Sequence, residues 1–317
     1  MEQNIIIGYD FQMACPNVKN IVSIQGLISM CAEFYLANLN KNDVKLTIRD
    51  LIKGTIYKNQ ELFYKKGEIE KEIIKNSNAI IGRTTWDFAN SSAFTQEIKY
   101  YKCNESLRDS FYDKVWNIDK IQRYSIYVSQ ASYPLKGFHV LLKAINILKE
   151  RYDNIKVYVA GNNILDNSNL KNKLKISGYA NYLIKLINKY HLKDNIVFTG
   201  LLNEREVVNR LLNSHVFVQT SSIENSSNAL GEAMLLGMPC VASNVGGTSD
   251  LLIDKNEGYL YPFGDYGLLA YYISKIFDED DISIKLGLNA RNHANITHDR
   301  ILNGKKMIKI YKDIIDN

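Results

Sequence analysis

Two glutamates, Glu224 and Glu232, stand eight positions apart in a stretch whose residue types suit the binding of phosphate and sugar. Carboxylates accept hydrogen bonds from sugar hydroxyls, and a helix N-terminus beside them offers unpaired N–H groups and partial positive charge to phosphate. Glu224 falls in a small, polar loop, and Glu232 falls one turn into the helix expected after it. The pair therefore favours a nucleotide-sugar site. The alternative is that Glu224 is a solvated loop residue and Glu232 only satisfies the helix dipole.

The elements around this pair follow from local sequence signals. Residues 215–220 (HVFVQT) are β-branched and aromatic, which predicts a buried strand. Ser227 or Asn228 is a suitable N-cap for a helix over about 229–236, and Gly237 follows as its C′ residue. The loop and the helix start should therefore lie at the carboxyl end of a sheet strand, where α/β sheets bind ligands.

From Ser125 onward, strand and helix patterns alternate regularly. This alternation predicts one complete Rossmann-like lobe, with a parallel, doubly wound sheet and right-handed crossovers. Besides the elements around the glutamates, strands are expected at 125–130, 155–160, 195–200, 239–243 and 258–261, and helices at 138–149, 179–190 and 203–212.

The first 122 residues have a different pattern. Strands are expected at 20–26 and 78–85, with a third over 99–104, and helices rich in Lys, Glu and Leu are expected between residues 29 and 76.

The region around the two glutamates resembles the donor-site signature of the family 4 retaining glycosyltransferases, which have the GT-B fold. That signature is E-x7-E, continued as E-A-M-x-x-G-x-P-V-V-A-S and then G-G. The matching residues are Glu224, Glu232-Ala233-Met234, Gly237, Pro239, Val241-Ala242-Ser243 and Gly246-Gly247. The segments SIQGL and GRTTWD are similar to the branch that makes capsular and cell-surface polysaccharides, and the resemblance covers roughly residues 18–310.

The resemblance implies an α/β protein of GT-B fold, with two Rossmann-like lobes that contain parallel doubly wound sheets. Residues 1–122 would form the acceptor-side lobe, residues 123–299 the nucleotide-sugar lobe, and residues 300–317 a helix that crosses back to the first lobe. The family normally has several βα units and a glycine-rich loop before the strand at 20–26, where Gly8 is the only glycine. We therefore expect the N-terminal lobe to be incomplete, as in a fragment or a reduced variant.

The resemblance also assigns roles in the donor site. Glu224 would bind hydroxyls of the donor sugar, Glu232 would bind the ribose, and Lys136, followed by Gly137, would contact the diphosphate. The backbone amides near the helix start would hold the same diphosphate, and two strand-end glycines would let the backbone approach the base or ribose. These residues are Asn228, Ala229, Leu230, Gly231, Gly161 and Gly200. Simple turn geometry is the alternative for the glycines.

The chain departs from the family at two positions. Gln130 stands where the family has an arginine at a strand end, and a neutral amide does not supply the charge of a guanidinium. Gln25 and Gly26 stand where many relatives carry a histidine near the reaction centre. Gln25 can hydrogen-bond sugar hydroxyls but cannot act as a base, and its alternative role is to satisfy the backbone at a strand end.

Two further candidates, Arg83 and Thr84, follow a strand at its carboxyl end. Arg83 would bind phosphate or the acceptor, with a surface ion pair as the alternative, and Thr84 would lie on the acceptor side.

Composition limits the function classes. The 317 residues are 46% hydrophobic and carry a net charge of +5, without a run of basic residues, so nucleic acid is not an expected partner. Weak attraction to an anionic membrane surface stays open. The four cysteines are scattered, the apolar runs are shorter than the ~18 residues of a membrane span, and no signal peptide is visible. These features predict a cytoplasmic protein.

The resemblance therefore implies transfer of a hexose to a saccharide or lipid-linked acceptor with retention of configuration, and a UDP-sugar is the expected donor. No metal and no cofactor beyond the donor substrate are expected. Two alternatives stay open: a nucleotide-sugar-binding remnant with weak or no catalysis, and a GT-B-fold epimerase or phosphorylase. The sequence leaves the oligomeric state undetermined.

Overall fold

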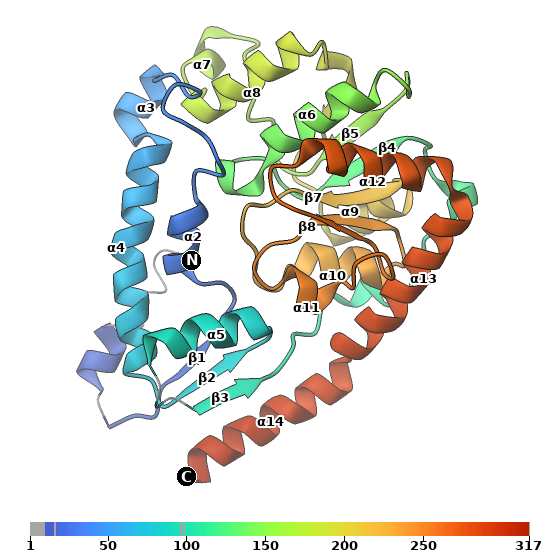
Figure 1. Cartoon of the computed structure of the whole chain (residues 1–317). Helices are drawn as coiled ribbons and strands as arrows, with labels where there is room; N and C mark the ends of the chain where they lie inside the picture. The colour runs from blue at the N-terminus through green and yellow to red at the C-terminus, as the bar shows by residue number, and fades with distance from the viewer. Residues whose placement is uncertain (1–9, 16, 96, 98, 317) are drawn as a thin grey trace.

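The computed structural model describes residues 10–15, 17–95, 97 and 99–316. Two parallel sheets organise the chain: a three-stranded sheet near the N-terminus and a six-stranded sheet after Ser125 (Figure 1). Both sheets are flanked by helices, so the predicted α/β architecture with two lobes is confirmed. None of the described helices is long and apolar enough to cross a membrane.

The six-stranded sheet has the order β6-β5-β4-β7-β8-β9, and every neighbouring pair is parallel. Chain order reverses at β4, which lies between β5 and β7. Loops that leave the carboxyl ends of β4 and β7 therefore meet, as in other doubly wound sheets. The strands are β4 (Ser125–Val128), β5 (Lys156–Val159), β6 (Ile196–Phe198), β7 (Val216–Gln219), β8 (Cys240–Ser243) and β9 (Tyr259–Tyr261).

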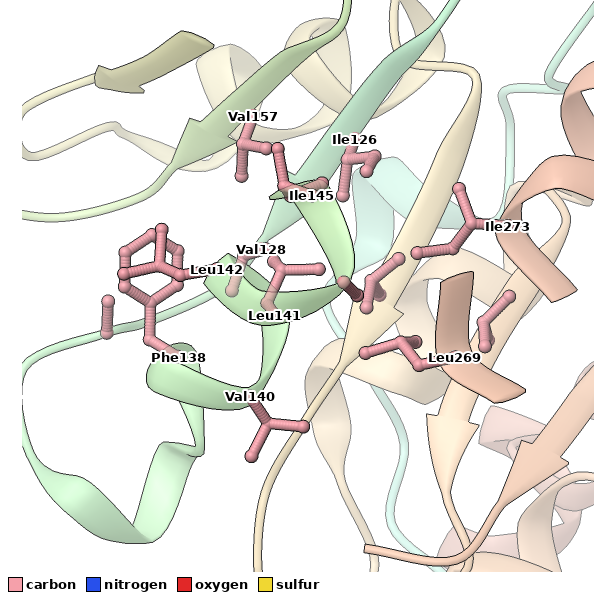
Figure 2. Close-up of a cluster of buried hydrophobic side chains, with 14 of the residues drawn as sticks. Ile126, Val128, Phe138, Val140, Leu141, Leu142, Ile145, Val157, Leu269 and Ile273 are labelled. Atoms are coloured by element: carbon pink, nitrogen blue, oxygen red, sulfur yellow. The ribbon is translucent and has the colours of Figure 1, made fainter. Parts of the chain in front are cut away.

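Successive residues of these strands point to opposite faces of the sheet, and each face has its own core. Ile126 and Val128 pack into one core together with α6 and α12, as Figure 2 shows. Tyr127, between them, packs into the second core with α10 and α13. The strands are apolar on both faces because helices cover both faces of a parallel sheet.

The helices of this lobe form those two layers. The first layer contains α6 (Phe138–Leu148), α8 (Gly178–Lys189) and α12 (Tyr266–Asp278), and α7 (Leu170–Lys173) lies beside α8 (Figure 1). The second layer contains α9 (Glu204–Leu212), α10 (Asn228–Leu235) and α13 (Asp280–Thr297), and a short helix, α11 (Thr248–Leu251), follows β8.

The smaller sheet is formed by β1 (Ile21–Ser23), β2 (Ala79–Gly82) and β3 (Lys99–Lys102), in that order. The strand predicted over 99–104 is therefore confirmed as β3. The helices α2 (Ile28–Phe34), α3 (Ile48–Lys53), α4 (Ile56–Lys75) and α5 (Thr85–Phe94) belong to this lobe. Helix α4 runs from the sheet to α3, which lies next to α7 and α8 of the other lobe (Figure 1).

The C-terminal helix, α14 (Arg300–Asp316), packs against the small sheet. Its Ile310 and Ile314 share a core with Ala79 and Ile81 of β2. Lys19 donates a hydrogen bond of 2.8 Å from Nζ to the carbonyl oxygen of Ile314. The last helix thus leaves the larger lobe and buries its apolar side on the smaller one.

Side chains also join the two lobes directly. The Asp50 carboxylate accepts a hydrogen bond of 2.8 Å from the amide of Gly178, the first residue of α8. Thr84 donates from Oγ1 to Oδ1 of Asn225 at 2.6 Å, and Asn225 donates to Asp87 at 2.9 Å. The loop that carries Glu224 is therefore held by the N-terminus of α5.

Candidate active site

Lys136 and Glu224 form an ion pair at the carboxyl ends of β4 and β7, the centre of the larger sheet. Their side chains are 19% and 17% exposed, and Ser221 donates a second hydrogen bond to Glu224 Oε1 at 2.7 Å. Burial alone lowers the pKa of Lys136, but the negative charge of Glu224, together with Tyr133 and the hydrogen bond, outweighs it and raises the pKa. Lys136 is therefore a charged group held next to the carboxylate predicted to bind the donor sugar.

The backbone around this pair is packed too closely for side chains at two glycines. A Cβ on Gly137 would lie 1.7 Å from the carbonyl oxygen of Thr220, and Gly137 has a positive φ of 63°. A Cβ on Gly246 would lie 1.9 Å from the carbonyl oxygen of Glu224. The same carbonyl oxygen accepts a hydrogen bond from Gly247 N at 3.0 Å. Gly137 and the Gly-Gly turn thus hold Lys136 and Glu224 in place.

Glu232 is paired with Arg108, a residue that the sequence analysis missed. Arg108 Nε and Nη2 each lie 2.7 Å from one carboxylate oxygen of Glu232, and the guanidinium stacks over Phe111 at 4.7 Å. The Arg108 side chain is 43% exposed and that of Glu232 is 8% exposed. Arg108 lies in the connection between the lobes, outside every motif, so no spacing signal marked it.

The N-terminus of α10 presents fewer free amides than predicted. Ser227 is the N-cap, and its Oγ accepts from Leu230 N at 3.4 Å, whereas its carbonyl accepts from Gly231 N at 3.0 Å. The Gly231 amide is thus used within the helix and the Leu230 amide faces its cap, as is ordinary for the first turn of a helix. The diphosphate roles of both residues stay predictions. Within the described residues, no hydrogen bond is found for the amides of Asn228 and Ala229, which remain the candidates.

Two predicted glycines, Gly161 and Gly200, lie at the ends of β5 and β6 and pair with each other. Gly161 N donates to Gly200 O at 3.0 Å, and a Cβ built on either residue has no atom within 4 Å. They face open space at the carboxyl ends of the strands, the same edge of the sheet at which Lys136 lies.

Gln130 is half-buried, and its amide donates to Ser132 Oγ at 2.8 Å. Ser132 lines a polar pocket of about 480 Å³, together with Arg49 of α3 and Lys175 beyond α7. The loop after β4 therefore opens on one side to Lys136 and on the other to this pocket.

The residues predicted on the acceptor side separate into two groups. Gln25 and Gly26 line a pocket of about 520 Å³ beside β1, which also includes Leu27, Glu70 and Ile74. Gln25 Nε2 donates to Glu105 Oε1 at 2.5 Å. Gln25 and Gly26 thus stay candidates for contact with an acceptor.

Arg83 and Thr84, in contrast, are buried at 4% and 1% exposure, and their acceptor-side roles stay predictions. Arg83 forms an ion pair with Glu105, whose side chain is 29% exposed, so the ion pair predicted at the surface is partly buried. Burial lowers the pKa of Arg83. Thr84 caps α5 and bonds to Asn225. Both side chains are used to hold the fold together.

Three further features bear on chemistry. Burial raises the pKa of the Cys31 thiol near Glu224 to about 12, so the thiol is neutral at physiological pH. His139 is buried between Tyr179 and the carbonyl of Ala37. Among the described residues, no group of three His, Cys, Asp or Glu side chains is placed to hold a metal ion.

Two helix-flanked parallel sheets and a polar site at the strand ends between them define a GT-B type α/β protein. Sucrose-phosphate synthase from Thermosynechococcus elongatus has this fold, with a TM-score of 0.75 at 16% identity over 98% of this chain and 72% of the other. HepE of Anabaena, in complex with UDP and glucose, gives 0.73 at 14% identity over 98% and 76%. At such identities the similarity shows the fold alone.

The sequence profile described as "Glycosyl transferases group 1" matches residues 109–293, more than half of the chain. The chain therefore belongs to this family. The matched region contains Lys136, Glu224 and Glu232.

Two curated relatives are similar over part of their length. Protein CapJ of Staphylococcus aureus is 28% identical over 184 residues, which are 55% of this chain and 42% of CapJ. UDP-Gal:alpha-D-GlcNAc-diphosphoundecaprenol alpha-1,3-galactosyltransferase of Escherichia coli is 29% identical over 126 residues, which are 40% and 30% of the two chains. The matches thus span less than half of either relative.

Proposed function

We propose that this chain transfers a hexose from a nucleotide-diphospho-sugar, with a UDP-sugar as the donor, to a saccharide or lipid-linked acceptor in cell-surface polysaccharide synthesis. The observation that carries the proposal is the Lys136–Glu224 pair, which lies at the strand ends where α/β sheets bind nucleotides. The name of the E. coli galactosyltransferase and the ligand of HepE in complex with UDP-glucose support it.

In the proposed reaction, the bond from the anomeric carbon to the diphosphate oxygen breaks, and a bond from that carbon to an acceptor oxygen forms on the same face of the sugar. This retention is the family 4 prediction. The leaving diphosphate gains negative charge, which the Lys136 ammonium and the free amides of Asn228 and Ala229 would stabilise. The acceptor proton would pass to a leaving phosphate oxygen, because Gln25 is not a base.

Glu224 and Glu232 divide the donor between them in this proposal. Glu224 would release Lys136 to the diphosphate and accept hydrogen bonds from the sugar hydroxyls. Glu232 would bind the ribose, although its two oxygens are paired with Arg108 in the described structure. The transfer is proposed to need no metal or cofactor. We also propose residues 1–122, 123–299 and 300–317 as acceptor-side lobe, donor lobe and crossing helix.

Thermal-shift measurements with UDP-, GDP- and ADP-sugars, followed by a UDP-release assay with candidate acceptors in EDTA, test the proposal. We expect a shift with UDP-sugars and acceptor-dependent release of UDP that EDTA leaves unchanged. No shift with any nucleotide-sugar would contradict it. Binding without release would favour the alternative of a nucleotide-sugar-binding remnant.

A further inference from the structure

Six aliphatic side chains project from one end of the molecule, on and around α3 and α7. They are Leu46, Ile48, Leu51, Ile52, Leu170 and Leu174, and they define what we call the α3–α7 surface. Leu170, Ile52 and Leu51 are 80%, 78% and 75% exposed, which places them among the most exposed large apolar residues described. Single exposed aliphatic residues are ordinary on a protein surface, but a cluster of them marks an interaction site.

The surface is continuous across the two lobes. Arg49 of α3 and Lys175 beyond α7 line one pocket, and Asp50 accepts a hydrogen bond from the first amide of α8. Figure 1 shows α3 beside α7 and α8 at the same end of the molecule. Segments that are far apart in the sequence therefore form one face.

Basic residues accompany the aliphatic ones. Residues 41–53 contain four basic and two acidic residues, and residues 166–175 contain three lysines and one aspartate. The two segments thus hold a net +4 of the chain's +5. The sequence has no run of basic residues, and the fold brings these two segments together. Asp50, only 5% exposed, is turned inward to its hydrogen-bond partner.

We propose that the α3–α7 surface docks on an anionic lipid bilayer. Exposed aliphatic side chains would enter the interface between headgroups and acyl chains, and the lysines around them would lie at the level of the anionic headgroups. Protruding leucine and isoleucine combined with positive charge match both parts of such a surface. The protein would then lie on the membrane without spanning it.

Two other occupants fit less well. Nucleic acid would satisfy the lysines but leave the six aliphatic chains against phosphate and water, and neither segment contains an aromatic residue on which a base could stack. A second copy bound through the same face would place two surfaces of net +4 against each other, which is repulsive.

The surface lies next to the candidate active site. Ser132, in the loop that leads to Lys136, lines the same pocket as Arg49 and Lys175. A bilayer at this face would bring lipid-linked acceptors close to the candidate active site with Lys136 and Glu224. This consequence rests on the proposed function, whereas the docking itself does not.

Co-sedimentation of the full chain with vesicles tests the docking. We expect wild-type protein to sediment with phosphatidylglycerol-containing vesicles, to do so less as salt rises, and to stay in solution with pure phosphatidylcholine. The variant Leu51→Asp/Ile52→Asp should reduce partition about tenfold or more, because each aliphatic side chain contributes by burial. Its matched control is Ile301→Asp/Leu302→Asp, two residues of α14 with 68% and 61% exposure, which should bind as wild type.

A charge-reversal pair gives a second readout. Lys45→Glu/Lys53→Glu should reduce partition strongly, since each basic residue at an anionic surface contributes about fivefold, while Lys305→Glu/Lys309→Glu on α14 should have little effect. Equal losses in the α3 and α14 variants, or wild-type binding by the α3 variants, would overturn the proposal. So would nucleic-acid binding without vesicle binding, or a dimer by light scattering that Leu51→Asp/Ile52→Asp disperses. UDP-sugar binding, measured in parallel without vesicles, keeps a failure of docking separate from a failure of the proposed function.

Discussion

Arg108 and Glu232 form an ion pair with two hydrogen bonds, both with nitrogen–oxygen distances of 2.7 Å, which joins the connection of the lobes to a residue one turn into α10. The pair places a guanidinium beside the carboxylate that the family resemblance assigns to the ribose. A carboxylate has about four acceptor sites, so two remain for hydroxyls when an arginine takes the other two. The donor site is thus partly assembled before a ligand arrives.

Glu232→Ala should weaken nucleotide-sugar binding by about 1.5–3 kcal/mol, because a charge-assisted hydrogen bond is lost. Calorimetry with UDP-glucose measures the change, and Glu150→Ala, at a 78% exposed side chain of the same lobe, is the control. Unchanged affinity would contradict the ribose role of Glu232.

A double-mutant cycle of Glu232→Ala and Arg108→Gln, measured by urea unfolding, should give a coupling free energy of about 1–2 kcal/mol between the two side chains. The value is moderate because the Arg108 side chain is 43% exposed.

Substitutions of Lys136 and Glu224 should have different effects on the binding of UDP and of UDP-glucose. Lys136→Met should weaken both UDP and UDP-glucose about tenfold or more, because the diphosphate loses a buried cation. Glu224→Gln should weaken UDP-glucose and leave UDP near wild-type affinity, since only the sugar hydroxyls lose a partner. Equal effects of Glu224→Gln on both ligands would show that this carboxylate acts through Lys136 alone.

Gln130→Arg should tighten diphosphate binding about five- to tenfold and make it more dependent on salt, because it restores a guanidinium beside the loop that carries Lys136. Isothermal titration with UDP at two salt concentrations measures this. Asn209→Arg, an exposed amide on α9, is the control for added charge. An unchanged affinity of Gln130→Arg for UDP would mean that another cation already neutralises the diphosphate there.

Gly137→Ala should lower the free energy of unfolding by about 2–4 kcal/mol, because the new Cβ would overlap the carbonyl of Thr220 and φ is 63°. Gly304→Ala is the matched control: it lies within α14, where a Cβ meets no atom within 4 Å, and should stabilise by about 0.5–1 kcal/mol. Thermal unfolding compares the two. A tolerated alanine at 137 would show that the loop after β4 moves freely.

Stability should fall as the pH drops from about 6.5 to about 4. Burial lowers the pKa of His139, and that of His215, from 6.5 to about 4. Within this window the unfolded chain binds protons at both imidazoles that the folded chain does not, so acid favours unfolding. His139→Gln should flatten the profile by about 3 kcal/mol between pH 7 and pH 4. His191→Asn, at an exposed histidine, should leave the slope unchanged.

Local sequence signals were sufficient for most of the larger lobe. The run 215–243 combines a β-branched strand, the Ser227 cap, a helix closed by Gly237 and a Pro-led strand, and the structure has β7, α10 and β8 there. Asp265 is the N-cap of α12, and its side chain accepts a hydrogen bond from Leu268 N at 2.9 Å. Such features depend on neighbours within a few residues, so the sequence contains them in full.

The sequence by itself thus determined the order of the elements, the two glutamates, and Lys136-Gly137 as the start of a helix. Tertiary structure alone decided which charges meet: Arg108 with Glu232, Lys136 with Glu224, and Arg83 with Glu105. Residues up to 124 positions apart form these contacts. Their pairing depends on how the two sheets and the connection between them pack, and no spacing in the chain encodes that geometry.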